Sequence, residues 1–400
     1  MHSEFIKSDI KLTIGILVSN RRQYIRGVMD SLKPILNQLS SELIAVDTKG
    51  IEGDGSIDIV REYTEKIYSF VWCDDFAAAR NVCLEHANGE WFLFIDDDEY
   101  FGDVQELISF FESGEAEEYQ SGNFNILNYK ADGSSSNGIV TRLIRRTQQT
   151  RFVGRIHEQL NESAGKRKVF RGIVLHHMGY AFQNDEESRI HQKRNTELLY
   201  KELEEKGYTS LLCAQLVQEL YSREETWQEG FRYAEKAIME LFRRGEMEDT
   251  CFQWLLTALI KYYVNCDDYT NAVKNAEFVR ENFRRSRMTE LVICGLLVEC
   301  ATKAKEFEMA VECAKSYLEQ WDWLCANETV AAQLLQLDFP KYYHIEYCFS
   351  VLHAGACSAN RLGRYETAME FWKRFPWKQP GFDGGKYFAE MQKTVMGLKK

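Results

Sequence analysis

The sequence has 400 residues, which is more than one ordinary domain accommodates, so two compact units are expected. Its apolar share of 45%, with 13% aromatic residues, supplies a real hydrophobic core and excludes a disordered chain. The net charge of −12 disfavours general nucleic-acid binding, because phosphate backbones need a basic protein face.

The cysteines and the first residues of the chain indicate in which cellular compartment the protein is expected. Eleven cysteines are scattered without a CxxC pair, which is typical of buried free thiols in a reducing compartment rather than of disulfides. Residues 1–11 carry no apolar signal-peptide core, and no apolar run is long enough to span a bilayer. The sequence therefore predicts a cytoplasmic protein without an integral membrane segment.

The first half of the chain alternates between predicted strands and helices. Residues 12–18 form a short apolar run rich in β-branched side chains, which is typical of a strand buried on both faces. A helix follows, with apolar side chains at four-residue steps. The further elements are strands at 42–46, 67–71 and 90–95, a helix opened by the loop 47–58, and a helix at 76–87. This rhythm predicts a parallel sheet with right-handed crossovers.

Polar side chains follow the ends of these strands. They are Asn20, Asp47, Asp74, Asp75 and the triplet Asp96, Asp97 and Asp98. Ligands of parallel sheets bind beyond the carboxyl ends of the strands, so we expect these side chains to surround one binding site.

The triplet itself indicates a cation. Three adjacent acids at the end of a buried strand repel one another, and a divalent cation is the simplest compensation. Because side chains alternate along an extended chain, Asp96 and Asp98 are expected to face the cation while Asp97 turns aside. The alternative is that Asp98 caps a following helix. A cation here would neutralise negative charge on a bound ligand.

Between about residues 120 and 180 the periodicity is mixed and predicts short strands, with a glycine- and serine-rich loop at 133–138. Two basic clusters in this region are either a solvated surface or partners of a diphosphate. They comprise Arg142, Arg145, Arg146, Arg151 and Arg155, and then Lys166, Arg167, Lys168 and Arg171.

Beyond about residue 185 the pattern is helical to the end. Three similar segments recur there, each with an aromatic residue followed three positions later by alanine. They are Asp268–Ala272, Glu306–Ala310 and Arg364–Ala368, and Trp227–Gly230 is a weaker copy with glycine in place of alanine. A bulky and a small residue at this spacing fit helix-pair packing of the tetratricopeptide type, and a generic helical bundle is the alternative.

Two long motifs resemble the family-2 glycosyltransferases of the GT-A fold: residues 72–81, WCDDFAAARN, and residues 89–99, GEWFLFIDDDE. The loop 47–58 is similar to the nucleotide-binding segment of that family, with an insertion around residues 50–52. Residues 154–158 and 177–180 resemble a subgroup with C-terminal tetratricopeptide-like helices, to which the bacteriocin (sublancin-type) S-glycosyltransferases belong.

The resemblance implies an architecture. Residues 1–185 would form an α/β GT-A domain with a Rossmann-like, mostly parallel sheet, and this domain would bind the nucleotide-sugar. Residues 186–400 would form an all-α domain of tetratricopeptide-like repeats.

The resemblance also implies roles for single residues at the strand ends. Asn20, Asp47 and Asp75 would bind the nucleotide, with Asp47 accepting from the uracil imide N–H, and Arg80 would pair with phosphate. Asp96 would hold the ribose and the metal. Alternatively, Asp47 caps the following turn, Asp75 is a solvated loop acid, and Arg80 is an exposed helical arginine bridged to Asp75 or Glu85.

Asp98 and His177 would complete the metal site, with His176 as the competing histidine. Carboxylates with an imidazole suit Mn²⁺ better than Ca²⁺, and Mg²⁺ stays an option. An inverting transfer needs a base, and Glu158 is the candidate. Its alternative is an ion pair with Arg155 or another nearby arginine. The usual aspartate base of the family is not identifiable by a motif.

The leading hypothesis is an inverting, metal-dependent enzyme. It would move a hexose or N-acetylhexosamine from a UDP-sugar to a Cys, Ser or Thr side chain of a peptide or protein, since stacked helix pairs form grooves for extended chains. One alternative is a transferase of cell-surface polysaccharide synthesis. Another is a repeat-based interaction protein with an inactive nucleotide-binding domain. The sequence leaves open the sugar, the S or O linkage and the oligomeric state, a homodimer included.

Overall fold

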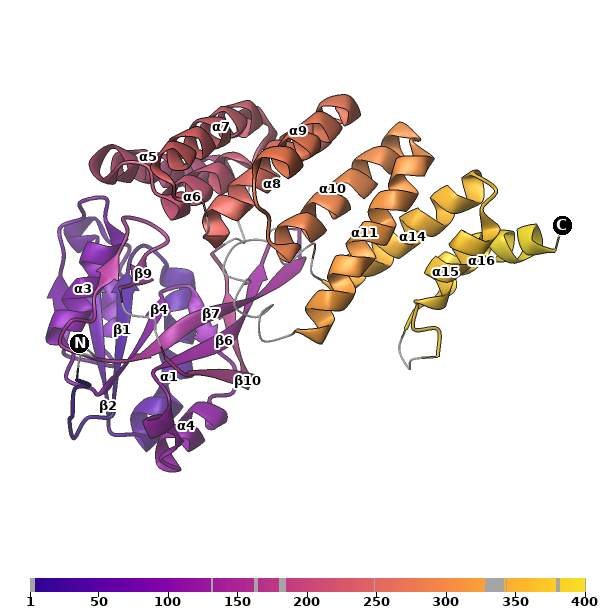
Figure 1. Cartoon of the computed structure of the whole chain (residues 1–400). Helices are drawn as coiled ribbons and strands as arrows, with labels where there is room; N and C mark the ends of the chain where they lie inside the picture. Colours follow the sequence, from indigo (N-terminus) through magenta and orange to yellow (C-terminus); the bar gives the residue numbers. More distant parts are fainter. Residues whose placement is uncertain are drawn as a thin grey trace. The chain divides into compact units, whose positions relative to one another are not determined.

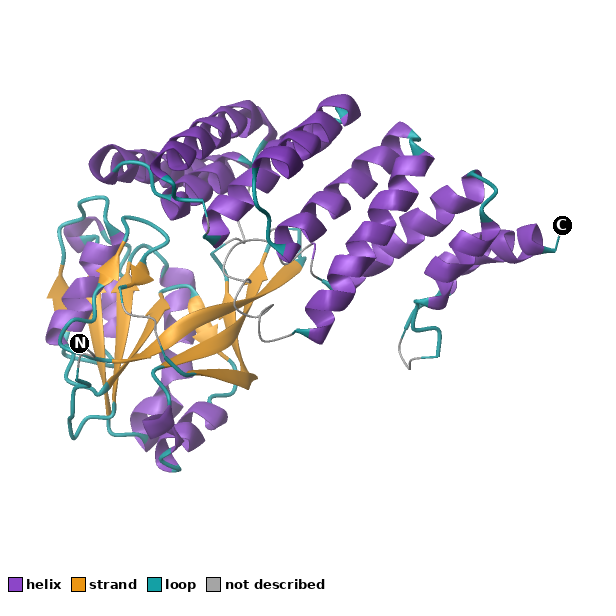
Figure 2. Cartoon of the chain, in the orientation of Figure 1, coloured by secondary structure: helices purple, strands orange, loops and turns teal. Residues whose placement is uncertain are grey.

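The computed structural model describes residues 4–130, 132–161, 165–179, 185–247, 249–327, 342, 344–378 and 382–399. The chain divides into two compact units, Met1–Glu202 and Leu203–Lys400. The first is an α/β unit, and the described part of the second consists of helices and their connections (Figures 1 and 2). This order confirms the predicted fold class.

In the described residues, the first unit is built on an eight-stranded sheet of order β3-β2-β1-β4-β7-β6-β10-β5. The first four strands run parallel. They are β1 (Leu12–Val18), β2 (Ser41–Asp47), β3 (Ile67–Ser69) and β4 (Trp91–Asp96). Every residue of β1 is buried, as expected for a central strand covered on both faces. The predicted parallel sheet is therefore confirmed.

Helices cover both faces of this sheet. On one face, α1 (Arg22–Gln38) buries a stripe at helical spacing that includes Ile25, Val28 and Leu32. α4 (Gln105–Glu112) contributes to the same core. On the other face, α3 (Phe76–His86) packs with Ala79 and Cys83 against residues of β1, β2 and β4. Short elements complete the parallel half: η1 (Gly50–Glu52) and α2 (Ser56–Val60).

The other half of the sheet is longer and more regular than the mixed periodicity predicted. Its strands are β5 (Glu99–Phe101), β6 (Ser121–Tyr129), β7 (Ser135–Arg145) and β10 (Arg167–His177), and η2 (Glu115–Glu118) precedes β6. The predicted loop at 133–138 is wrong in its second half, because β7 begins at Ser135 and pairs with Tyr129. Backbone hydrogen bonds form this ladder, so its exposed end needs no apolar side chains.

A small second sheet and a long helix follow. β8 (Phe152–Val153) pairs with β9 (Gln159–Leu160), and α5 spans Asp185–Lys206. Lys201 of α5 pairs with Asp74, and Glu202 accepts from the Arg155 N–H at 2.7 Å. The change of periodicity near residue 185 thus marks the start of α5, but this helix belongs to the first unit as far as Glu202.

The described part of the second unit is a series of helix pairs, whose members lie side by side (Figure 1). The pairs are α6 (Ser210–Leu220) with α7 (Trp227–Arg244), α8 (Thr250–Asn265) with α9 (Tyr269–Asn282), α10 (Arg287–Ala304) with α11 (Phe307–Ala326), and α14 (Ile345–Arg361) with α15 (Tyr365–Lys373). A short η3 (Glu224–Thr226) precedes α7, and α16 (Gly385–Leu398) follows the last pair.

The aromatic repeat of the sequence coincides with the second helix of each pair. Each such helix begins at the aromatic residue, and the small residue three positions later is buried. The small residues are Gly230, Ala272, Ala310 and Ala368. Helix pairing is therefore observed at the predicted positions, while the tetratricopeptide type stays a prediction.

One turn recurs between the paired helices. Asp267, Lys305 and Gly363 each adopt a positive φ of 55°, 62° and 73°, two positions before the aromatic residue. The next N–H bonds to a carbonyl five residues earlier at 2.8, 2.9 and 2.8 Å, as in a Schellman motif. The repeated segment therefore also reflects backbone geometry. A residue in the left-handed conformation ends the first helix of each of these pairs, and the chain then reverses direction into the second helix.

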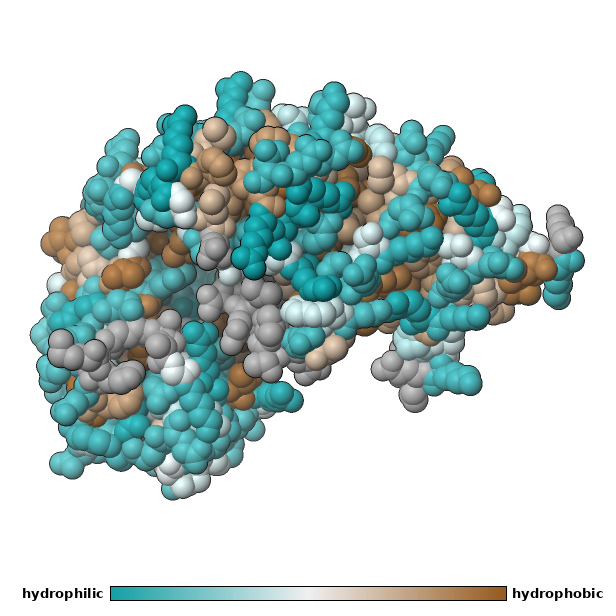
Figure 3. All heavy atoms as spheres, viewed as in Figure 1, coloured by the Kyte–Doolittle hydropathy of each residue, from teal (hydrophilic) through white to brown (hydrophobic). Residues whose placement is uncertain are grey.

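The surface of the protein is mostly polar on the face that Figure 3 shows. On this face most side chains are hydrophilic, and apolar side chains lie in groups among the hydrophilic ones. Within the described part of the chain, no helix is long and apolar enough to cross a membrane.

Candidate functional site

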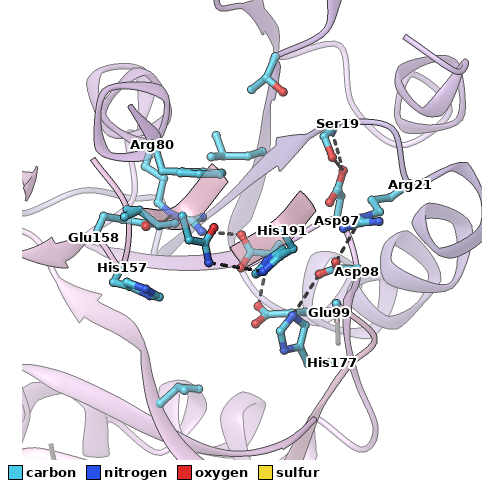
Figure 4. A pocket seen from close by; sticks show the side chains of 18 of the residues that line it. Ser19, Arg21, Arg80, Asp97, Asp98, Glu99, His157, Glu158, His177 and His191 are labelled. Atoms are coloured by element: carbon cyan, nitrogen blue, oxygen red, sulfur yellow. Dashed lines mark hydrogen bonds and ion pairs between the residues drawn. The ribbon is translucent and has the colours of Figure 1, made fainter. Parts of the chain in front are cut away.

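A cavity of about 470 Å³ lies in the first unit, at the carboxyl ends of β1 and β4 (Figure 4). Its walls come from the β1–α1 turn, the start of α3, the turn after β4, the middle strands, the β8–β9 hairpin and α5. The lining residues are Leu17, Ser19, Arg21, Thr48, Trp72, Phe76, Arg80, Asp96, Asp97, Asp98, Glu99, Ile126, Asn128, Val140, Arg142, Ile156, His157, Glu158, His177, Gly179, His191, Arg194 and Asn195.

Five of the predicted site residues meet in this cavity: Arg80, Asp96, Asp98, Glu158 and His177. They come from segments as far apart as α3 and β10, which only the folded sheet brings together. Their roles stay predictions, but their proximity is a property of the fold.

Three other predicted residues do not line the cavity, and each makes a local contact instead. Asp47 accepts from the N–H groups of Lys49 and Gly50, both at 3.0 Å. Asp75 caps α3 through the Ala78 N–H at 2.8 Å, and Asn20 accepts from the Asp54 N–H at 3.0 Å. For Asp47 the structure shows the turn-capping alternative, and for Asp75 a helix cap rather than a solvated acid.

Asp96 is held by two arginines. Its Oδ1 lies 2.5 Å from Nη2 of Arg80, and its Oδ2 lies 3.3 Å from Nη2 of Arg142. Glu99 pairs with Arg142 and also accepts from the Asp96 N–H at 3.1 Å. Burial raises the pKa of Asp96, but the positive charges of Arg80 and Arg142 outweigh it and bring that pKa below its ordinary value. Asp96 is thus an ionised and rigidly oriented carboxylate.

Arg80 connects the two ends of the cavity. It is 3% exposed, and its guanidinium pairs with both Asp96 and Glu158. The ring of Phe94 lies 5.3 Å from its guanidinium carbon. The expected alternative, an exposed arginine bridged to Asp75 or Glu85, is wrong, because Arg80 faces the core of the site. For the same reason Glu158 pairs with Arg80 rather than with Arg155.

Asp97 and Asp98 point in different directions, but they lie in the turn after β4 rather than in an extended strand, and both line the cavity. Asp97 accepts from the N–H and Oγ of Ser19 at 2.5 and 2.8 Å. Asp98 lies 3.3 Å from Nε of Arg21 and 3.5 Å from Nε2 of His177 (Figure 4). Asp98 does not cap a helix, because β5 follows it.

Both of these acids carry charge that their neighbours compensate incompletely. Burial and the adjacent Asp98 raise the pKa of Asp97 to about 7. Burial raises the pKa of Asp98 to about 6, with Asp96 and Glu99 acting in the same direction against His177 and Arg21. The cavity walls contain five acids and four arginines, so a bound diphosphate would add to an existing surplus of negative charge.

The divalent cation of the Mn²⁺ or Mg²⁺ type stays a prediction, and two of its three expected ligands, Asp98 and His177, lie close together. Carboxylate oxygens and an imidazole nitrogen face one another at Asp98 and His177, and a cation would balance the surplus acid. Of the two candidate histidines, His177 reaches the cavity, whereas His176 stacks on Tyr100 and bonds to the Tyr129 hydroxyl at 2.9 Å. Among the described residues, no three His, Cys, Asp or Glu side chains already form a metal cage.

His177 is fixed from two sides. Its Nδ1 lies 2.7 Å from Oδ1 of Asn128, which orients the ring. On the other side, a Cβ added to Gly179 would lie 2.4 Å from Nε2 of His177 and 3.1 Å from Oδ2 of Asp98. Glycine at this position therefore allows the chain to pass close to the pair. Tyr180, the next residue of the predicted motif, lies outside the described residues.

Sequence reasoning missed several residues of the cavity. Arg142 was seen only as part of a basic cluster, and Arg21 and Ser19 carried no signal. Three residues of α5, His191, Arg194 and Asn195, also line the cavity. Their spacing on one helix face could have grouped them, but nothing in the sequence shows which cavity that face meets.

One protein-family model and several known glycosyltransferases resemble part of this chain. Residues 13–165 match the family model for glycosyl transferase family 2. Over 206 residues the chain is 27% identical to the SPbeta prophage-derived glycosyltransferase SunS of Bacillus subtilis (strain 168), an alignment that covers 47% of this chain and 43% of that protein. Over 173 residues it is 27% identical to the poly(ribitol-phosphate) beta-glucosyltransferase of Bacillus spizizenii, covering 42% of this chain and 26% of that protein.

The chain thus spans less than half the length of these curated relatives. Among solved structures, S. aureus TarS 1-349 in complex with UDP-GlcNAc is similar with a TM-score of 0.38 and 15% identity. That alignment covers 68% of this chain and 92% of the other.

Proposed function

We propose, from the premise that residues 13–165 form a glycosyltransferase family 2 domain, that this protein transfers a sugar from a nucleotide-sugar donor. The observation that carries the proposal is the meeting of Arg80, Asp96, Asp98 and His177 in one cavity at the carboxyl ends of parallel strands. The cavity volume lies within the range of small-molecule sites, about 300–1,000 Å³. An interaction protein that had lost its activity would have no reason to keep these charges converging.

The donor we propose is a UDP-sugar carrying a hexose or N-acetylhexosamine. Asp96, Asp98 and His177 would hold a divalent cation, which when bound supplies positive charge for the departing diphosphate. Arg80 and Arg142 orient the Asp96 carboxylate, and the alignment of the Asp98 carboxylate comes from His177 and Arg21. At Asp96 the protein's own contribution is therefore a carboxylate oriented before the donor arrives.

The reaction we propose inverts the anomeric carbon. An acceptor oxygen or sulfur attacks that carbon, the bond to the diphosphate oxygen breaks, and the acceptor proton passes to a base. Glu158 is the proposed base, and its pairing with Nε of Arg80 holds its carboxylate beside the guanidinium whose Nη2 pairs with Asp96. A thiol acceptor would need less help from the base, because thiols ionise nearer neutral pH.

The acceptor we propose is a Cys, Ser or Thr side chain of a peptide or protein. It is supported by the resemblance to bacteriocin S-glycosyltransferases and by the stacked helix pairs of the second unit. A second candidate, transfer to a cell-surface polymer, is favoured by the similarity to the poly(ribitol-phosphate) beta-glucosyltransferase. We propose a cytoplasmic site of action for either.

Donor hydrolysis tests the proposal without knowledge of the acceptor. Purified protein with Mn²⁺ and a panel of UDP-sugars should release UDP slowly, and calorimetry should detect UDP binding. Asp98→Asn should abolish Mn²⁺-dependent release while the far-UV circular dichroism stays unchanged. A protein that releases no UDP from any donor and binds none would refute the proposed function. To separate the acceptors, synthetic peptides and poly(ribitol phosphate) are compared as substrates, since only the true class gives a glycosylated product.

A further inference from the structure

Asp96 and Asp98, two of the proposed cation ligands, are neutralised in different ways. The partners of Asp96 are Arg80 and Arg142, whose side chains are 4% and 15% exposed. The arginine partner of Asp98, which also faces His177, is Arg21, whose side chain is 37% exposed. The arginines at Asp96 are enclosed by protein, and moving them would leave buried charges unpaired. Arg21 can leave Asp98 for solvent at small cost.

Hydrogen bonds hold the backbone around Arg21, while its side chain is partly exposed. The Arg21 N–H donates to Oγ of Ser56 at 3.2 Å, and Ser19, two residues earlier, is bonded to Asp97. The following Arg22 N–H donates to Oδ2 of Asp54 at 2.9 Å. The guanidinium of Arg21 lines the cavity next to Asp98 (Figure 4), at the end of a side chain whose backbone is well held.

Arg21 and a cation exclude each other at Asp98. The carboxylate has one oxygen toward His177 and the other toward Arg21, at 3.5 and 3.3 Å. A divalent cation bound between Asp98 and His177 would lie a few ångströms from the guanidinium, where like charges repel strongly in a partly buried site. Arg21 must therefore turn away when the cation binds.

We propose that Arg21 is a displaceable counter-ion: it neutralises Asp98 in the empty site, gives way to the cation and then binds the diphosphate of the donor. The inference rests on the proposed function, since it needs a cation and a diphosphate in this cavity. The negative diphosphate is the nearest new partner for the released guanidinium, and arginine binds phosphate oxygens through paired N–H donors. The exchange couples cation binding to donor binding.

The test uses two binding measurements on the full chain, whose expected changes have opposite signs. Binding of Mn²⁺ alone is followed through the electron paramagnetic resonance signal of the free ion. UDP binding at saturating Mn²⁺ is followed by calorimetry. Arg21→Gln should bind Mn²⁺ about tenfold more tightly, because the competing charge is gone. It should bind UDP about tenfold more weakly, the loss expected for one charge-assisted hydrogen bond.

Two further variants control for fold and charge. Arg22→Gln removes the same charge one residue along α1, where the side chain donates to the Asp54 carbonyl at 3.1 Å, and should change neither affinity by more than about twofold. Arg21→Lys keeps a positive charge and should stay close to the wild type in Mn²⁺ binding while losing part of the UDP affinity.

The outcomes separate the inference from the proposed function. Mn²⁺ affinity that is unchanged or weaker in Arg21→Gln would show that Arg21 does not compete with the cation. Unchanged UDP affinity would show that it does not pass to the diphosphate. Either result overturns the inference while leaving the proposed function standing. Wild-type protein that binds neither UDP nor Mn²⁺ would overturn both.

Discussion

At the scale of single residues, the site depends on a buried chain of alternating charges. Glu158, Arg80, Asp96, Arg142 and Glu99 follow one another through ion pairs. Most members of the chain are withdrawn from water, and Asp96 is about two-thirds withdrawn, so the chain is costly to interrupt. This explains why residues that orient the site are also expected to stabilise the fold.

Arg80 allows this expectation to be measured. Arg80→Gln leaves Glu158 and one oxygen of Asp96 without their cation, so the free energy of unfolding should fall by about 3–5 kcal/mol. Arg80→Lys should lose less, because the charge remains while the forked geometry is lost. Urea titration followed by circular dichroism measures both. Arg26→Gln is the control, since Arg26 pairs with Glu62 on the surface and its loss should be undetectable. Equal losses for the two glutamine variants would contradict the buried charge chain.

Asp97 should make stability depend on pH. Its pKa in the folded protein is raised to about 7, above the ordinary value of 3.8, so the folded state holds this proton more tightly than the unfolded chain. Its contribution is therefore most favourable at low pH and is lost as the pH rises from about 4 to about 7.

The comparison of wild type with Asp97→Asn isolates this effect from other titrating groups. Between pH 5 and pH 7 the wild type should lose about 2 kcal/mol of unfolding free energy relative to the variant, without added cation. Urea titrations at several pH values give this difference. A constant difference across the range would mean that Asp97 is ionised in the fold like an ordinary acid.

At the scale of elements, sequence predicts the strands and helices whose pattern of apolar and polar side chains follows from their burial. β1 and β4 were predicted because a strand buried on both faces must be apolar throughout. The first residues of β7 were not, because Ser135 to Gly138 join the sheet through backbone bonds alone. The site followed the same division. Asp96 and Asp98 are predictable from an acidic triplet at a strand end, and Arg80 and His177 from the family resemblance, while the pairing of Arg21 with Asp98 joins residues with no shared pattern.

The turns between paired helices contain a residue in the left-handed conformation, which costs free energy unless that residue is glycine. Lys305 adopts the left-handed conformation that glycine adopts at Gly363 in the equivalent turn. A side chain there costs about 1 kcal/mol relative to glycine. Lys305→Gly should therefore raise the melting temperature of the helical unit by about 2–4 °C, and Gly363→Ala should lower it by a similar amount. Scanning calorimetry measures both shifts, and shifts of the same sign in the two variants would contradict a shared turn.

At the scale of the whole molecule, the chain places its proposed chemistry in one unit. The described residues that line the cavity belong to Met1–Glu202, including those of α5, although the periodicity of the sequence changes to helical near residue 185. Sequence periodicity reports the type of an element, whereas the unit to which a helix belongs depends on contacts such as Lys201 with Asp74. The first unit should thus bind the donor by its own residues.

Calorimetry of the full chain tests this assignment. The two units have separate cores, so two unfolding transitions are expected. UDP with Mn²⁺ at about 100 times the dissociation constant stabilises its site by about 2.7 kcal/mol, which should raise one transition by about 5–10 °C. The transition that moves should be the one that Arg80→Gln lowers, and the transition that Lys305→Gly raises should stay in place. Equal ligand-induced shifts in both transitions would show that the second unit contributes to the donor site, and a single transition would show that the two units unfold together.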